Sequence, residues 1–342
     1  MTQSIELPAG YLTKTTTYKI IHSVNLELDI VYPQETSVDP VPVLIHYHGG
    51  FLIIGDRFSF LPYWLLNACA ARKWIFVTPN YRLIPESTAH DAVADALDAF
   101  LWVKTSLSRT LGVTVGPVIS AGSSAGAYLA MISASVSSVK PDALVLLYGM
   151  LDPSSERYTT PGTNILGMPP IDGQPILDQF ETLKQQGRAN PLAGYPVPSD
   201  LASDFRMGLI AAAHCMGVLP DLMTSIPGLS RDIARHSTVA IPTEAKHLFP
   251  IGCSGDVVLP RTAILHGKND NVVPFAASQV AADTLRKMGT EVYTEFLDDA
   301  CHSFDTMVGN INIEKSNAPE ARTPAFDGLR RIIKFLDEIA RP

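Results

Sequence analysis

The sequence predicts an α/β protein with a mostly parallel central sheet and an inserted helical segment. Strand-like apolar runs alternate with helical stretches over residues 1–150, which is the order of a doubly wound sheet. Several of these runs are continuously apolar, as is typical of strands buried on both faces of a parallel sheet. The alternation then stops, because residues 152–260 contain no clear strand.

The strands are expected in a definite order along the chain. Segments 17–21 and 26–33 predict a hairpin, because the second alternates between apolar and polar residues. The later strands are expected at 41–50, 74–82, 116–126, 143–150, 261–267 and 291–297. The helices between and after them are expected at 60–72, 90–104, 127–138, 275–289 and 326–340.

The long interval between the strands at 143–150 and 261–267 predicts a separate unit. A single crossover helix needs only about 10–15 residues, so this interval must hold structure of its own. Helical stretches near 175–187 and 200–217 are divided by turns rich in proline and glycine. We therefore expect a core formed by 1–151 and 261–342, with a helical cap inserted at 152–260.

Composition and charge exclude several classes of function. The chain has 342 residues, and 26 Lys and Arg against 34 Asp and Glu give a net charge of −8 without any basic run. Such a chain is a poor match for nucleic acid or for an anionic membrane surface. It has no apolar stretch long enough to span a bilayer, and MTQSIELPAG lacks the features of a secretory signal.

The cysteines and histidines give no sign of a disulfide framework or a metal site. Cys69, Cys215, Cys253 and Cys301 are far apart in the chain. Free thiols in a reducing compartment are the default interpretation, and a cytoplasmic location is expected. No metal-ligand spacing stands out among the nine histidines, so no metal is expected.

The strongest chemical signal is the pentapeptide Gly122-Ser123-Ser124-Ala125-Gly126. Its spacing makes Ser124 the central residue of a G-x-S-x-G turn, which holds a serine oxygen clear of the backbone between a strand and a helix. An apolar run precedes it and an Ala-rich helical stretch follows it, as this turn requires. A turn of small residues that only lets a helix pack on the sheet remains the alternative.

A second signal lies at the end of the strand expected at 41–50. His48-Gly49-Gly50 would place backbone amides beside the nucleophile, where attack on a carbonyl creates an oxyanion. The N–H groups of Gly49, Gly50 and Ala125 are the expected donors. His48 is interpreted as an organiser of the loop rather than a proton carrier, and an ordinary turn at a strand end remains the alternative.

The acid and base are expected after the last two strands. Asp270 in HGKNDNVVP follows one strand and His302 in CHSF follows the next. Asp270 would orient the His302 ring, which would take the proton from Ser124. The alternatives are an aspartate that caps a turn and a histidine on a surface loop. Three further acids could compete with Asp270, and they are Asp298, Asp299 and Asp305.

These motifs resemble one branch of the α/β hydrolases, the carboxylesterases and lipases that are similar to hormone-sensitive lipase. The matching stretches are HYHGGF, NYRLIPE, GSSAG, HGKNDNVVP and CHSF, between residues 46 and 304. The order serine, acid, histidine is also that of the α/β-hydrolase fold. The resemblance implies a sheet of about eight strands flanked by helices, a helical cap, a broad-specificity ester hydrolase and no metal or organic cofactor.

The sequence departs from the pattern of this family in places that affect the substrate pocket. Phe51 replaces the third glycine of the usual His-Gly-Gly-Gly, and Ser123 replaces the usual aspartate before the nucleophile. The chain is most similar to fungal members of the group, which suggests a bulky secondary-metabolite ester as substrate. Phe51, Ser123, Phe205 and Met207 are the candidate substrate-binding residues. Arg82 and Glu86 flank a proline turn and are expected to form an ion pair.

The sequence thus predicts a serine esterase that acts on a small-molecule ester through an acyl-enzyme intermediate. A thioesterase, a lactonase or a peptidase of the same fold remains open, because the leaving group cannot be read from these motifs. A hydrolase homologue that only binds a ligand is the alternative from another class. A homodimer is also left open.

Overall fold

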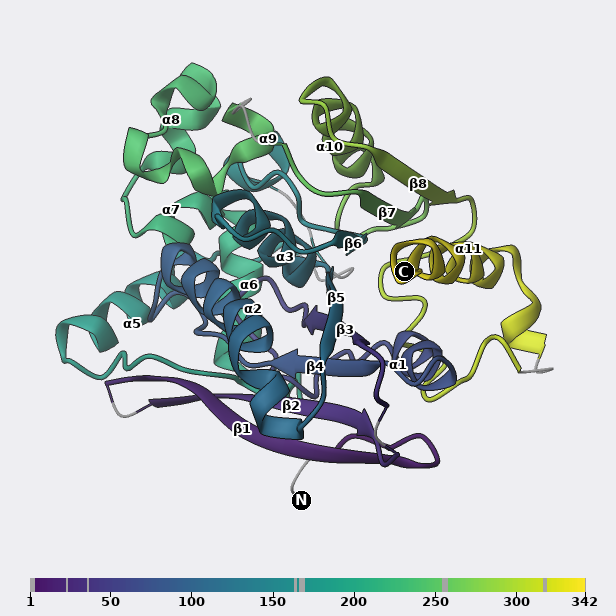
Figure 1. The fold of residues 1–342 in the computed structure, drawn as a ribbon. Coiled ribbons are helices and arrows are strands. Elements are labelled where there is room, and N and C mark those ends of the chain that lie inside the picture. The colour runs from purple at the N-terminus through teal and green to yellow at the C-terminus, as the bar shows by residue number, and fades with distance from the viewer. Residues whose placement is uncertain are drawn as a thin grey trace.

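A single sheet of eight strands forms the centre of the protein, in the order β1-β2-β4-β3-β5-β6-β7-β8 (Figure 1). The computed structural model describes residues 4–22, 24–35, 37–162, 165, 170–253, 258–315 and 319–341. The strands are β1 (Tyr11–Ile21), β2 (Val24–Pro33), β3 (Val41–Tyr47), β4 (Ile75–Pro79), β5 (Val115–Ser123), β6 (Ala143–Leu147), β7 (Thr262–Gly267) and β8 (Val292–Leu297). All eight expected strands are present, and the predicted fold class is confirmed.

The direction of the strands follows from how they are connected. The expected hairpin of β1 and β2 is antiparallel, and β2 also runs antiparallel to β4. From β4 to β8 every neighbouring pair is parallel. The carboxyl ends of these parallel strands therefore lie along one edge of the sheet, and the loops that leave them can meet there.

Helices cover both faces of the sheet and bury two apolar clusters. The cluster on one face includes side chains from α2 (Ala89–Leu111), α3 (Ala125–Val136) and α10 (Phe275–Lys287). The cluster on the other face includes side chains from α1 (Tyr63–Ala71) and α11 (Pro324–Ile339). Figure 1 shows α1 and α11 together on one side of the sheet, away from α2 and α3.

Helix α2 is longer than the predicted 90–104 because signals at both of its ends extend it. Thr88 accepts a hydrogen bond from the Asp91 N–H, and the Asp91 carboxylate accepts from the Thr88 N–H, which forms a capping box. The helix ends at Gly112, whose φ of 71° is a left-handed conformation that suits glycine. The range predicted from the sequence ended with the apolar run at residue 104, so it left out the more polar last two turns of the helix.

Residues 152–260 form helices and, in their described part, no named strand. The helices are α4 (Glu156–Thr159), α5 (Gln174–Gln185), α6 (Phe205–Cys215), α7 (Leu219–Thr224), α8 (Leu229–His236) and α9 (Pro250–Cys253). The two helices expected from the sequence correspond to α5 and α6. Helix α6 begins later than predicted, because Asp204 caps it by accepting from the amides of Arg206 and Met207.

The division of the chain into core and cap stays a prediction. Helix α7 packs against α2, and α9 packs against α10, so parts of 152–260 lie beside helices of the expected core. Helix α6 instead packs mainly against its neighbours α4, α5 and α7.

Arg206 attaches α6 to the loops that follow β3 and β4. Its guanidinium donates to the carboxylate of Glu86 at 2.6 Å and to the carbonyl oxygens of Ile53 and Ile84 at 2.6 and 2.7 Å. The side chains of Arg206 and Glu86 are 4% and 10% exposed, so water screens this pair little. The expected pair of Arg82 with Glu86 is therefore wrong, because Glu86 is taken by Arg206.

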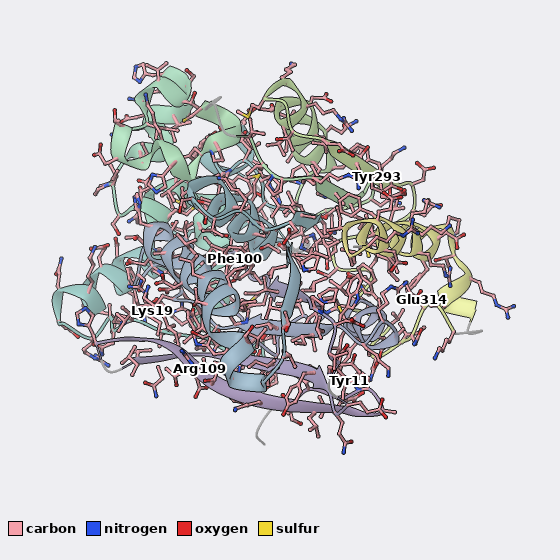
Figure 2. All side chains as sticks on the ribbon, in the orientation of Figure 1. Tyr11, Lys19, Phe100, Arg109, Tyr293 and Glu314 are labelled. Atoms are coloured by element: carbon pink, nitrogen blue, oxygen red, sulfur yellow. The ribbon has the colours of Figure 1, made fainter. Side chains whose placement is uncertain are left out.

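Arg82 pairs with α2 instead. Its Nε lies 2.7 Å from Asp95 Oδ2 and its Nη1 lies 2.9 Å from Asp91 Oδ1. The Asp95 carboxylate is fully buried and also accepts from Lys19 of β1 at 2.7 Å, while Lys19 reaches the half-exposed Asp98 at 2.6 Å. Lys19 is labelled in Figure 2. This cluster ties α2 to β1 and to the turn after β4.

We expect Asp95→Asn to destabilise the protein far more than Asp98→Asn. The first change removes the buried carboxylate that Arg82 and Lys19 share and leaves Arg82 only its partly exposed partner Asp91, which costs about 3 kcal/mol or more of unfolding free energy. The second weakens a surface pair and costs about 1 kcal/mol or less. Chemical denaturation of both variants measures the difference, and equal losses would contradict this account of the cluster.

Candidate active site

Ser124 lies at a strained turn between β5 and α3. Its φ is 54°, a left-handed conformation that is unusual for a residue with a side chain. The turn is also tightly packed, because a Cβ atom on Gly126 would lie 2.0 Å from the carbonyl oxygen of Tyr47 in β3. This geometry is that of the predicted nucleophile turn, which in general holds a serine hydroxyl clear of the sheet.

The Gly49-Gly50 loop after β3 lies directly against Ser124. A Cβ atom on Gly49 would lie 3.2 Å from the Cβ atom of Ser124, so no larger residue fits there without displacement. Within the part of the chain that the structure describes, the amide N–H groups of Gly49, Gly50 and Ala125 donate to no protein acceptor. Unpaired amides beside a nucleophile are suited to bind a developing oxyanion.

His48 holds this loop through contacts of its ring and its backbone. Its Nδ1–H donates to the Gly49 carbonyl at 2.8 Å, and its ring stacks on Tyr81 with 4.2 Å between the centroids. The Tyr81 hydroxyl donates to the His48 carbonyl at 2.8 Å. Burial lowers the pKa of His48 to about 4, so the ring stays neutral.

The structure brings Asp270 and His302 into direct contact. The Nδ1–H of His302, in the loop after β8, donates to Asp270 Oδ2 at 2.6 Å. The other carboxylate oxygen of Asp270 accepts from the amides of Val272 and Val273 at 2.8 and 2.9 Å. The hydrogen bond to Asp270 uses Nδ1 of His302 and leaves its Nε2 free to accept a proton.

The carboxyl of Asp270 is held in its ionised form. Burial alone would raise its pKa, but hydrogen bonds from the His266 and His302 rings outweigh the burial and hold the pKa well below its usual range. A carboxylate that stays charged can both orient the His302 ring and stabilise its protonated form.

The competing acids do not bond to His302. Asp298 is exposed and pairs with Lys268 at 2.6 Å, and Asp299 is exposed as well. Asp305 is fully buried, but its carboxylate accepts from Trp64 Nε1 and from the Tyr148 hydroxyl, both at 2.7 Å. Of the acids weighed in the sequence, only Asp270 contacts the histidine.

Ser124 and His302 line the same cavity of about 450 Å³. No hydrogen bond joins these two described side chains in the structure. Catalytic hydrogen bonds are often long in a site without substrate and tighten when substrate binds. The cavity therefore contains the predicted nucleophile and base with the two glycines of the loop beside them.

Three of the four candidate substrate-binding residues line the cavity, and Phe205 does not. Phe51, Ser123 and Met207 line it, whereas Phe205 is partly buried and packs against the core cluster. The helix geometry of α6 explains the difference, because residues two apart point to nearly opposite sides. Ile210, three residues after Met207, shares its side of α6 and also lines the cavity.

The site contains contacts that the sequence motifs did not indicate. The hydroxyl of Ser123 is within 2.9 Å of His46 Nε2, so this residue is held within the sheet although it reaches the cavity wall. The Tyr148 ring meets the His302 ring edge-on at 4.8 Å between centroids. Val197 and Leu201, from the Pro-rich stretch before α6, also line the cavity. Their turn-like local sequence gives no signal for such a role.

The described residues give no indication of a metal centre or of a helix that crosses a membrane. They contain no group of three or more His, Cys, Asp or Glu side chains that could hold a metal ion. None of their helices is both long and apolar enough to traverse a bilayer. The four cysteines are free. The cytoplasmic location and the assembly state stay predictions.

Comparison with known families identifies the fold and agrees with this geometry. The model of an α/β-hydrolase-fold family matches residues 44–216, which include the Gly49-Gly50 loop, Ser124 and α6. The chain belongs to this α/β-hydrolase family. The resemblance drawn from the sequence motifs is thereby confirmed.

Relatives of this α/β hydrolase include a probable carboxylesterase and parts of much larger proteins. It is 26% identical over 293 residues to a probable carboxylesterase M8 of Phoma sp., across 80% of this chain and 82% of that protein. It is 25% identical over 320 residues to the non-reducing polyketide synthase pkbA of Emericella nidulans, across 84% of this chain. The chain spans only 13% of that synthase.

A solved structure shows the same fold. A bacterial heroin esterase aligns with a TM-score of 0.61 at 18% identity, across 98% of this α/β hydrolase and 86% of that protein.

We expect the stability of this α/β hydrolase to fall as the pH drops from about 6.5 towards 4. Burial lowers the pKa of His214 to about 4. The buried ring meets the Phe51 ring edge-on, with 4.7 Å between the ring centroids. In this pH window the unfolded chain binds a proton at His214 and the folded chain does not, so acid favours unfolding. His214→Gln should reduce the slope by about 1.4 kcal/mol per pH unit.

Denaturant unfolding at pH 7, 6 and 5 measures this slope. His22→Gln, at an exposed turn after β1, is the matched control and should keep the slope of the unmodified protein. An unchanged slope in His214→Gln would contradict the assignment.

Proposed function

We propose that this chain hydrolyses carboxylic esters with Ser124 as nucleophile, His302 as general base and Asp270 as the acid that orients it. The observation that carries the proposal is the bond between Asp270 and His302 at the wall of a cavity that also exposes Ser124. The unpaired amides of Gly49 and Gly50 beside that serine support it. Similarity to a probable carboxylesterase of Phoma sp. points to the same chemistry.

The geometry supports a reaction in two stages. Ser124 Oγ attacks the ester carbonyl while its proton passes to His302 Nε2, and the oxyanion accepts from the amides of Gly49, Gly50 and Ala125. His302 then protonates the leaving alcohol, which departs and leaves an acyl group on Ser124. Water attacks this acyl group as the same histidine removes its proton, and the acid is released.

The cavity favours a substrate with a sizeable apolar part. Its volume of about 450 Å³ lies in the range of small-molecule sites, and most of its wall is apolar. Phe51 lies on the side of the proposed oxyanion donors, and Met207 and Ile210 contribute from α6. We propose a bulky ester, and the similarity to parts of polyketide synthases supports a secondary metabolite as its source.

Ser124→Ala should lower kcat by several powers of ten and abolish labelling by a fluorophosphonate, because no nucleophile remains. Ser120→Ala is the matched control, since Ser120 is a buried serine of β5, the strand that leads into the turn at Ser124. Turnover of p-nitrophenyl esters by the purified variants measures the effect.

Matched ester, thioester and peptide substrates, assayed with the same preparations, identify the preferred leaving group. Full ester turnover by a folded Ser124→Ala protein would overturn the proposed function.

A larger residue at position 207 should narrow the range of substrates. Met207→Trp fills the cavity and should lower kcat/KM for long acyl esters by about tenfold or more relative to acetate esters. Phe205→Trp is the control, because this side chain lies two residues away and does not line the cavity. An equal change in selectivity in both variants would contradict the assigned cavity wall.

A further inference from the structure

The carboxylate of Asp270 has a second imidazole partner. His266, near the end of β7, is fully buried, and its Nε2 lies 3.0 Å from Asp270 Oδ2. The same nitrogen lies 3.0 Å from the Val273 carbonyl oxygen. The other ring nitrogen, Nδ1, lies 2.7 Å from Ser278 Oγ on α10, which is also fully buried. The proposed mechanism uses neither His266 nor Ser278.

These contacts fix the tautomer of His266. A carboxylate and a carbonyl can only accept hydrogen bonds, so Nε2 carries the proton and donates to both. Nδ1 is then the acceptor and the Ser278 hydroxyl donates to it. A donor at Nδ1 polarises the ring and makes its Nε2–H a stronger donor. Ser278, His266, Asp270 and His302 thus form one chain of hydrogen bonds.

All acceptor positions of Asp270 that face the protein are therefore used. One oxygen accepts from two imidazoles and the other from the amides of Val272 and Val273. Without His266, Oδ2 would keep His302 as its only donor, and the amides on Oδ1 would restrain the carboxylate with one donor fewer. The second imidazole therefore holds the carboxylate more firmly in the plane that His302 requires.

We propose that His266, held in one tautomer by Ser278, is a positioning residue that fixes the Asp270 carboxylate and moderates its pull on the His302 proton. This inference rests on the proposed function, since it concerns the acid of the same site. It adds two residues that act through Asp270 and do not touch the substrate.

Other charged and titratable groups surround these hydrogen bonds, and the test leaves them unchanged. The Arg157 guanidinium donates to the Val272 carbonyl at 3.0 Å and interacts electrostatically with Asp270, as does the Tyr158 phenol. Asp305 interacts electrostatically with His302 and bonds to Tyr148, whose ring contacts His302. Any shift seen on changing His266 alone is therefore assigned to its own hydrogen bond.

The test compares His266→Leu with His266→Gln in ester hydrolysis. Leucine removes one of the two donors to Oδ2, which holds the carboxylate less firmly, and kcat should fall by about tenfold or more while KM changes by about twofold or less. A carboxylate with one donor fewer is also more basic and holds a proton on His302 more firmly. The acid limb of the kcat/KM profile should therefore move to higher pH by about 0.5 unit. His266→Gln retains an N–H donor, so its kcat and the acid limb of its kcat/KM profile should stay close to those of the unmodified protein.

Ser278→Ala tests the other end of this chain of hydrogen bonds, and it replaces His266→Leu in the test if that variant does not fold. It weakens the His266 donor without removing it, so the acid limb should move in the same direction by a smaller amount. Ser230→Ala, which removes a buried hydroxyl from α8, is the matched control for stability and should leave the pH profile unchanged. A profile of Ser278→Ala that coincides with that of Ser230→Ala overturns the inference.

The two hypotheses fail in different ways. A fully active Ser124→Ala protein would remove the proposed function. If Ser124 is required but His266→Leu matches His266→Gln in kcat and in its acid limb, the function stands and the positioning role of His266 falls.

Discussion

The close approach of β3 to the turn at Ser124 is the constraint on which the rest of the site depends. Gly126 packs so tightly on the Tyr47 carbonyl that an added Cβ would lie 2.0 Å from it, and Gly49 lies against Ser124 itself. The left-handed backbone of Ser124 persists because this packing determines it. The same packing places the Gly49 and Gly50 amides beside the serine, so one contact between two neighbouring strands sets both the proposed nucleophile and its proposed oxyanion donors.

The opposite side of the site is organised by buried hydrogen bonds rather than by backbone packing. Asp270 and His302 leave from β7 and β8, which are adjacent and parallel, so their loops meet at the same edge of the sheet. Burial strengthens each hydrogen bond there and makes an unpaired group costly. Four hydrogen-bond donors surround the Asp270 carboxylate, so neither of its oxygens is left unpaired. They keep the carboxylate charged and oriented without any contribution from substrate.

The sequence was sufficient where local spacing determines geometry and insufficient where contacts join distant segments. The pentapeptide around Ser124 and the strand ends at Gly49 and Asp270 indicate their own positions, because a turn or a strand end is set by neighbouring residues. The expected Arg82–Glu86 pair was wrong because the true partners, Asp95 and Arg206, lie on helices whose docking no local pattern encodes. Phe205 was misplaced because the rotation of α6 about its axis depends on Arg206 and on its cap at Asp204.

Arg206 also links the two parts of the site that would act on substrate. It donates to the Ile53 carbonyl, and the amides of Ile53 and Ile54 donate to the Gly50 carbonyl, so a side chain of α6 anchors the turn that follows the proposed oxyanion donors. The next residue, Met207, lines the cavity. A substrate that displaced α6 from its place at the cavity wall would also pull on the Gly50 loop through Arg206. The α6 part of the cavity wall and the loop of the proposed oxyanion donors are therefore joined by hydrogen bonds, so a change in the position of one is transmitted to the other.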